Sequence, residues 1–449
     1  MAEPLILHEN SMNKEKIRLI LWLAIPAMIE NMLQTVVGFV DTLFVAELGL
    51  EQVAAVGVSN TILAVYIAIF MAMGTGASAL IAKSVGAGDW ERAQAIARQS
   101  TWISVWLGLL FGIITMFFAE PLLRIMGAEP DVLADGVIYF RIVAVPSVLI
   151  ALMTVFGSIL RAVGDTKAPM RVGIRINFIN IVLDYVFIFG LWGIPGWGIA
   201  GAAWATVVAR LIGAILLYLH IRKTKLSFSL WKGTSSAYTM PLLQISTPAA
   251  VERLIMRFGQ VLYFGLIVRI GTDVYAAHVI AGNIEIISYM PGYGLAVAAT
   301  TLVGQHLGAN RQKDAYRYGL LTIGIAVVFM SFVGILLFIF SPLAATWFTD
   351  QKDVVGMVTT ALRIDAFAQP FLAFGLVVAG ALQGAGDTKS PMYSTAIGMW
   401  LIRVVGVYVL SIVFDFGIAG VWLSIAIDLI IRAFYLFYRY QKKVGSFKE

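Results

Sequence analysis

The stretch that decides the fold is LAIPAMIENMLQTVVGFVDTLFVAELG, residues 23–49. At about 1.5 Å per residue, a helix of this length crosses a hydrocarbon core of about 30 Å. Glu30, Gln34 and Asp41 interrupt the apolar run, and at about 100° per residue they fall on one stripe of the helix. A carboxylate at membrane depth is costly and usually faces a polar cavity. The stripe therefore predicts a functional acid at Asp41.

Pro26 lies upstream on the same predicted helix. A proline inside a helix removes a backbone hydrogen bond and can kink the helix. We therefore expect Pro26 to act as a hinge. A protonatable group on a bendable membrane helix is the hypothesis that follows.

The composition predicts an all-α polytopic membrane protein. Of 449 residues, 60% are hydrophobic and 13% charged, with a mean hydropathy of +0.87, whereas a soluble domain carries about 25% charged residues. There is no cysteine and the four histidines are scattered, which excludes disulfides and Cys-ligated metals. The basic residues behind the net charge of +6 sit in short loops, so they indicate topology and not nucleic-acid binding. The polar N-terminus predicts no cleavable signal peptide.

Loop charges set the predicted topology. Basic loops alternate with acidic ones along the chain, and the positive-inside rule then places both termini in the cytoplasm of a bacterial-type inner membrane. An even number of spans agrees with this. The twelve apolar runs are approximately 16–48, 53–82, 94–119, 132–160, 168–191, 197–220, 239–269, 275–305, 315–342, 354–383, 392–414 and 417–438.

The second half of the chain repeats the first. Pro26 and Pro248 lie 222 residues apart, and LRAVGDTKAPM has its echo in LQGAGDTKSPM at the same offset. Six helices in each half predict two lobes of the same orientation around a central cleft, as in transporters built from parallel repeats. We expect an N-terminal lobe over residues 1–221, a cytoplasmic linker over 222–238 and a C-terminal lobe over 239–449.

Polar side chains gather in the first half. Asn177, Asn180 and Asp184 are spaced to share one face of the fifth predicted span. Two acids in one lobe need a counter-charge, a shared proton or a cation, so Asp41 and Asp184 are expected to be functional. Plain hydrogen bonding between helices remains the alternative for the amides. Further polar or aromatic candidates in the fourth and sixth spans are Tyr139, Trp204 and Thr206.

The repeat preserves the scaffold and not these charges. The positions that correspond to Asp41 and Asp184 are Tyr263 and Gly406, so we expect the buried polar cluster to exist only once. Glu285, deep in the eighth span, has no counterpart in the first half. Glu30 and Glu252 are counterparts, which favours a structural role for them, with Arg253 or Arg257 as partners.

Energy must come from an ion gradient or from a partner, because the chain has no GxxxxGK[ST] motif for nucleotide hydrolysis. The two GDTK segments are interpreted as cytoplasmic turns ahead of a proline-initiated helix.

Several stretches of the chain point to one known family: IPAMIENMLQTVVGFVDTLFVAELG, the VGAGD turn, the two GDTK segments, and INFINIVLDYVFIFG followed by GIAGAAWAT. Together they resemble the multidrug and toxic compound extrusion (MATE) family, most closely its DinF-like branch. The resemblance implies twelve helices in two lobes and drug export in exchange for H⁺ or Na⁺. It implies Asp41 as the coupling residue. The partners that it implies are Gln34, Tyr139, Asn180, Asp184 and Thr206.

Sodium-coupled relatives are expected to carry acids in spans seven and ten. The approximate matching positions here, Met256 and Phe371 or Leu372, are apolar. This disfavours a sodium site in the second lobe and leaves Na⁺ at Asp41 and Asp184 open.

We therefore predict a proton-coupled exporter of amphipathic organic cations, monomeric in membrane lipid, with no cofactor and no enzymatic activity. A sodium-coupled antiporter is one alternative. A flippase for lipid-linked precursors is another, although it would want a cleft rich in Arg and Lys. The predicted substrate contacts are Asp41, Asn177, Trp204, Met256 and Glu285.

Overall fold

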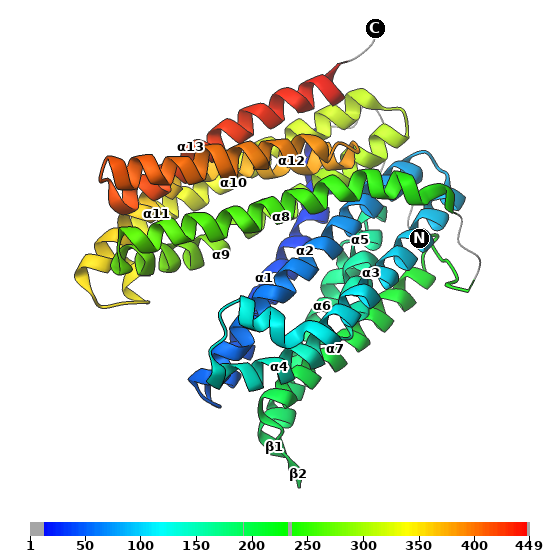
Figure 1. Ribbon diagram of the computed structural model, residues 1–449. Helices are drawn as coiled ribbons and strands as arrows, with labels where there is room; N and C mark the ends of the chain where they lie inside the picture. Colours follow the sequence, from blue (N-terminus) through cyan, green and yellow to red (C-terminus); the bar gives the residue numbers. More distant parts are fainter. Residues whose placement is uncertain (1–12, 192, 232–235, 447–449) are drawn as a thin grey trace. The chain divides into compact units, whose positions relative to one another are not determined.

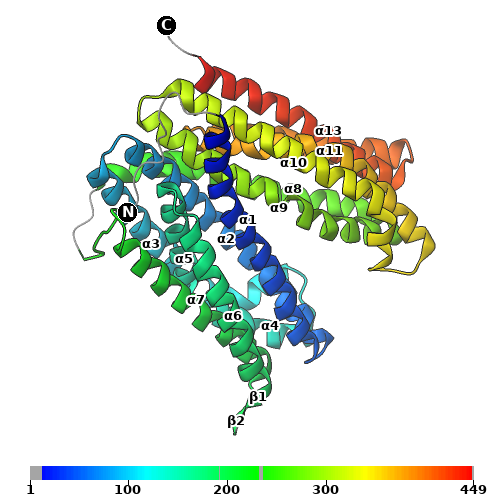
Figure 2. The same ribbon diagram turned by 180° about the vertical axis from the view of Figure 1, so that it is seen from behind.

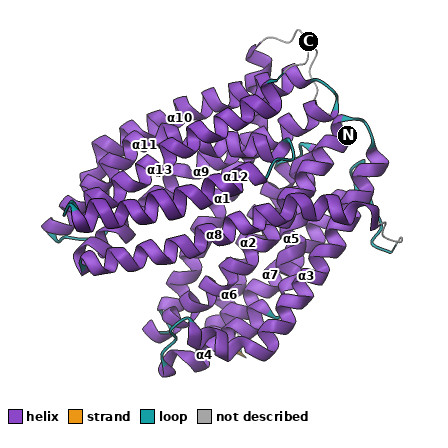
Figure 3. Ribbon diagram, turned by 45° about the horizontal axis from the view of Figure 1, so that its top comes forward, coloured by secondary structure: helices purple, strands orange, loops and turns teal. Residues whose placement is uncertain are grey.

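The computed structural model describes residues 13–191, 193–231 and 236–446. Residues 232–235 of the predicted linker therefore lie outside the described residues. Helices account for nearly all of the described chain, as Figure 3 shows by colour. The helices of the first half are α1 (Asn13–Ala46), α2 (Leu50–Gly86), α3 (Trp90–Ile125), α4 (Pro130–Ala144), α5 (Ser147–Val163), α6 (Lys167–Phe189) and α7 (Gly198–Arg222).

The second half begins with a short 3₁₀ turn, η1 (Ser236–Tyr238). It continues with α8 (Thr239–Ile270), α9 (Thr272–Gly308), α10 (Gln312–Thr346), α11 (Lys352–Gly384), α12 (Lys389–Ala396), the π-helical stretches η2 (Ile397–Val404) and η3 (Val407–Val413), α13 (Gly417–Tyr440) and a final π turn, η4 (Gln441–Gly445). The order can be followed from blue to red in Figure 1.

Ten helical segments in the described residues are long and apolar enough to cross a membrane, and the bent pair α4–α5 makes an eleventh span. The remaining long helix, α8, carries Glu252, Arg253 and Arg257 in its interior, which lowers its hydropathy. Counting α8 as well gives twelve long helical segments among the described residues, the number of spans that the sequence predicts. The prediction of an all-α polytopic membrane protein is confirmed.

The fourth span is broken because Pro146 stands between α4 and α5, which meet at an angle of 48°. A proline cannot donate the backbone hydrogen bond that would continue the helix. Glycines of α3 make room for the break: a Cβ at Gly108 would lie 2.6 Å from the Cα of Val148. The bend is therefore held by close backbone packing.

The fifth and sixth spans form a tight pair. A short β-hairpin joins α6 to α7, and its strands are two residues long, β1 (Gly190–Leu191) and β2 (Ile194–Pro195). The two helices run side by side in Figures 1 and 2. The Trp197 backbone N–H donates 2.8 Å to the Phe187 carbonyl at the start of α7. This pairing fixes α6, which carries Asn180 and Asp184.

The chain divides into two compact units. The N-terminal unit contains Ile29–Ser84 and Asp89–Ala250, and the C-terminal unit contains residues 13–28, Val85–Gly88 and the described chain from Val251 onward. Residues of helix α1 therefore belong to both units, and the division lies between Met28 and Ile29, two residues after Pro26. The lobe boundaries that we predict from the sequence repeat stay a prediction.

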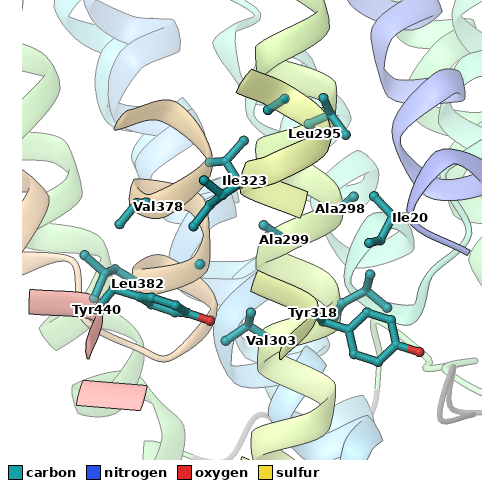
Figure 4. Packing of buried hydrophobic residues seen from close by; sticks show 14 of the residues in the cluster. Ile20, Leu295, Ala298, Ala299, Val303, Tyr318, Ile323, Val378, Leu382 and Tyr440 are labelled. Carbon is teal, nitrogen blue, oxygen red and sulfur yellow. The ribbon is translucent and has the colours of Figure 1, made fainter. Parts of the chain in front are cut away.

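Each unit has its own apolar core. In the N-terminal unit, Phe70, Phe140 and Leu123 are among the buried side chains. In the C-terminal unit, the side chains of Ile20 and Tyr318 lie in the cluster drawn in Figure 4. In a membrane, where lipid tails are as apolar as these side chains, close van der Waals packing of this kind holds together the helices that carry the polar residues described next.

Candidate functional site

Asp41, Asn180 and Asp184 form one hydrogen-bonded group in the N-terminal unit. The Asn180 side-chain amide donates 3.1 Å to Oδ1 of Asp41 and 2.7 Å to Oδ2 of Asp184. Asn180 is 6% exposed and Asp184 is 1% exposed, while Asp41 is half-buried. One amide from α6 thus joins an acid of its own helix to an acid of α1.

The two carboxyl groups also lie within hydrogen-bonding range of each other. A hydrogen bond between two carboxyls requires a proton on one of them, because ionised carboxylates only accept. Like charges at this distance in a buried site oppose simultaneous ionisation. Two acids this close to each other therefore need a shared proton, a cation or a nearby positive charge.

Arg210 is a neighbour of this group that sequence reasoning missed. It lies on α7, and its guanidinium interacts electrostatically with Asp41 and Tyr139. Its buried Nη1 has no hydrogen-bond partner among the described residues. An arginine in the middle of an apolar span is usually functional, so its position in the run 197–220 would have been enough to predict Arg210 as a site residue.

Tyr139 lies where the sequence places it, buried on α4 with Asp41, Asp184 and Arg210 as electrostatic neighbours. Asn177, one turn before Asn180, is half-buried, and its amide nitrogen is a buried donor without a partner in the described chain. Tyr139 therefore belongs to the surroundings of the acid pair, while Asn177 offers an unused amide donor one turn away on α6.

Three other predicted residues do not join the group. Gln34 is exposed on α1 and makes no hydrogen bond to it within the described residues. The Thr206 hydroxyl donates 3.0 Å to the Ala202 carbonyl of its own helix. Trp204 is 47% exposed on α7.

The remaining two predicted substrate contacts belong to the C-terminal unit. Met256 packs against the apolar cluster around Tyr263. Glu285 is half-buried on α9 and interacts electrostatically with Arg403 and Asp365. Within this unit, then, Glu285 sits among charges and Met256 among apolar side chains.

The repeated glutamates find different partners. Glu30 accepts two hydrogen bonds of 3.1 Å from Arg161 of α5, so its partner is neither Arg253 nor Arg257. Glu252 accepts 3.1 Å from the Thr395 hydroxyl, and Arg253 is an electrostatic neighbour. The two acids occupy equivalent positions and make unrelated contacts.

The expectation of a single buried polar cluster is wrong. In the C-terminal unit, Asp428 is fully buried and accepts hydrogen bonds from Arg403 and Arg432. Asp365 and Gln369 are buried nearby on α11. A comparison that starts from Asp41 and Asp184 does not reveal this cluster, because Asp365 and Arg403 correspond to the apolar residues Val143 and Ile181 at the repeat offset of 222.

No group of three or more His, Cys, Asp or Glu side chains within the described chain is arranged to hold a metal ion. Pro26 is buried inside α1, three residues before Ile29, where the described part of the N-terminal unit begins.

The two carboxyls of the acid pair therefore have one amide donor, one arginine and one tyrosine around them.

Comparison with known proteins gives consistent matches over almost the whole chain. The MatE family model matches residues 26–186 and 248–409. A probable multidrug resistance protein NorM of Thermotoga maritima is 31% identical, with 99% of this chain and 98% of that protein covered. The uncharacterized transporter YisQ of Bacillus subtilis is 30% identical, with 93% of each chain covered.

Solved structures agree. One described as the outward-facing conformation of a multidrug resistance MATE family transporter of the MOP superfamily superposes with a TM-score of 0.90 at 26% identity, covering 97% of each chain.

Proposed function

The chain belongs to the MatE family of membrane transporters, and on that premise we propose that it exports multiple drugs by exchanging amphipathic organic cations for protons. Members of this family are transporters and not enzymes. The DinF-like branch remains a prediction from the sequence.

The observation that carries the proposal is the carboxyl pair of Asp41 and Asp184 around Asn180. A buried pair of acids with one shared proton is a site where a proton and a cation exclude one another. With the proton bound, the pair carries one negative charge, which Arg210 offsets; without it, the surplus charge attracts a cation. Export is then driven by the proton gradient.

The proposed cycle is alternating access. An organic cation binds while the pair is deprotonated, and proton entry from the outer side cancels the charge and lowers the affinity for the cation. Helix α1 is proposed to change its bend at Pro26 when the proton binds, because the proline leaves a carbonyl of this helix without its helical donor. Asn177 and Trp204 are the proposed substrate contacts in the N-terminal unit, and Met256 and Glu285 those in the C-terminal unit.

Sodium coupling is the second candidate. The carboxylate oxygens of Asp41 and Asp184 are ligands that Na⁺ accepts in place of the shared proton. A flippase for lipid-linked precursors has less support, because a pyrophosphate needs several cationic side chains and the group around Asp41 offers two acids and one arginine.

The protein is proposed to work as a monomer in the lipid of a bacterial-type inner membrane, with both termini in the cytoplasm. The positive-inside pattern of the loops supports this orientation.

The test is Asp41→Asn in sealed lipid vesicles, with efflux of a fluorescent organic cation driven by a pH gradient. We expect at least a tenfold loss of gradient-driven transport, with Asp131→Asn, an exposed acid at the start of α4, as the control with normal transport. Unchanged transport by Asp41→Asn would refute the proposal. Transport that follows a sodium gradient at constant pH, and not a pH gradient, would favour the sodium alternative.

A further inference from the structure

The geometry points to a second proton-binding carboxyl in this protein, Asp365 of the C-terminal unit, which holds and exchanges a proton of its own. This goes beyond the proposed function and does not depend on Asp41 being the coupling residue. All residues that carry it belong to the C-terminal unit.

Asp365 is buried with unpaired acceptors around it. Asp365 is 1% exposed and Gln369, one turn later on α11, is 0% exposed. The Gln369 amide donates to Oδ2 of Asp365 at 2.5 Å and to the Ser288 hydroxyl at 3.2 Å. Both N–H groups of Gln369 are therefore in use.

Two oxygens at this place lack a donor. Oδ1 of Asp365 and Oε1 of Gln369 are buried and have no hydrogen-bond partner among the described residues. The Ser288 hydroxyl cannot supply one, because it donates 2.7 Å to the Glu285 carbonyl. A buried acceptor without a donor costs about 1–3 kcal/mol, and more when it is charged. A proton on Oδ1 removes the charge and turns that oxygen into a donor.

The nearby arginines are matched by other acids, so no arginine of the described chain is left to balance the charge of Asp365. Asp428 binds Arg403 and Arg432, and Arg403 also interacts with Glu285. Glu252 is an electrostatic neighbour of Arg253 and Arg432. Three arginines thus offset three carboxylates: Arg253, Arg403 and Arg432 against Glu252, Glu285 and Asp428.

The charged neighbour of Asp365 itself is Glu285, which has the same sign. An acid beside a like charge and away from water takes up a proton. The step is simple: the carboxylate of Asp365 gains H⁺ and becomes a neutral carboxylic acid, with no other bond made or broken.

Other titratable groups on the packed helices do not supply a positive charge to Asp365. On α9, His278 is buried against Trp422 and Phe264, and Tyr289 neighbours Glu285. On α10, the charged residues lie in the first two turns, where Asp314 pairs with Lys16 and Arg311. On α11 and α8, Arg363 and Arg257 are exposed.

The backbone beside Asp365 packs closely against α10. A Cβ at Gly334 of α10 would lie 2.6 Å from the carbonyl of Ala366, the residue after Asp365, and 3.5 Å from the Cβ of Gln369. About four turns further along α11, a Cβ at Gly380 would lie 2.5 Å from the Ala296 carbonyl of α9. These contacts hold the part of α11 that carries Asp365 in place.

A proton fits this site better than a metal cation. The described residues contain no group of three acids or histidines arranged around a common point, and hard cations are usually bound by about six oxygens. Asp365 and Gln369 offer two free oxygens between them.

The test is infrared difference spectroscopy of the full-length protein in lipid vesicles as the pH is raised. The signal is the carbonyl stretch of a protonated carboxylic acid, which disappears on deprotonation. The variants are Asp365→Asn, Asp41→Asn, both together, and the exposed control Asp131→Asn. We expect Asp365→Asn to lose one carboxylic acid band that the wild type, Asp41→Asn and Asp131→Asn all retain.

An Asp365→Asn spectrum identical to that of the wild type would overturn the inference. So would a band that never titrates while the protein stays folded, or one that Na⁺ removes at constant pH. If Asp365→Asn does not fold, the second variant is Gln369→Leu, which keeps Asp365 and removes the amide that donates to it. The carboxylic acid band assigned to Asp365 must then shift in frequency. A band at the wild-type frequency in Gln369→Leu would contradict the assignment. Because the Asp41→Asn arm is read separately, failure here leaves the proposed function standing.

Discussion

The side-chain amide of Asn180 donates 3.1 Å to the carboxylate of Asp41, a residue 139 positions earlier in the chain. The same amide donates 2.7 Å to Asp184 on its own helix. A side chain with only two N–H groups is therefore hydrogen-bonded to both acids of the proposed coupling pair.

Replacing Asn180 by Leu should uncouple transport from the proton gradient. Loss of both donors leaves the buried carboxyl of Asp184 and the half-buried carboxyl of Asp41 each without the hydrogen bond from Asn180, which costs about 1–3 kcal/mol for a fully buried group. We expect pH-gradient-driven efflux to fall at least tenfold in vesicles while the protein still folds. Thr206→Val is the matched control, since its hydroxyl bonds only to its own helix. Equal transport by the two variants would argue against a role for the amide.

Replacing Arg210 by Met should move the pH dependence of transport to higher pH. Removal of a positive charge near Asp41 favours the protonated form of the acid pair, so more alkaline conditions are needed to free the pair for a cation. The measurement is the initial efflux rate across a series of internal pH values. Arg210→Lys, which keeps the charge, should retain the wild-type profile, and a profile unmoved in Arg210→Met would exclude an electrostatic role.

Replacing Glu30 by Gln should lower stability without changing the coupling. Glu30 accepts two hydrogen bonds from Arg161 in a partly buried setting, and hydrogen bonds to charged groups contribute about 1.5–3 kcal/mol each. Thermal unfolding in detergent should therefore show a lower Tm.

Glu120→Gln, which breaks the exposed pair with Arg124, provides the comparison for Glu30→Gln. An exposed ion pair contributes about 0–1 kcal/mol, so its Tm should hardly change. Equal losses of stability in the two variants would contradict the structural role of Glu30.

The sequence predicts much of this site because helical spacing and intramembrane charge are local signals. Asn177, Asn180 and Asp184 share a face by spacing alone, and Asp41 is conspicuous as an acid within an apolar run. Contact between α1 and α6 depends on tertiary packing, so Asn180 as the link between the two acids could not be derived from spacing.

Several charged residues of the two buried clusters were not predicted from the sequence, among them Arg210, Asp365, Asp428 and Arg432. Arg210 and Asp365 each interrupt an apolar span, which is the same signal that identifies Asp41. Asp428 and Arg432 are four residues apart on one helix, a spacing that predicts an ion pair. Unpaired oxygens such as Oδ1 of Asp365 are visible only once all neighbouring helices are in place.

The π-helical stretch η2 limits how this span can be altered in length. Its hydrogen bonds reach one residue further than in an α-helix, and Arg403, its second-last residue, donates 3.0 Å to Asp428. Insertion or deletion of a single residue before Arg403 would rotate the guanidinium off its acid. Designers who shorten, fuse or graft this span should therefore treat residues 397–404 as a unit of fixed length.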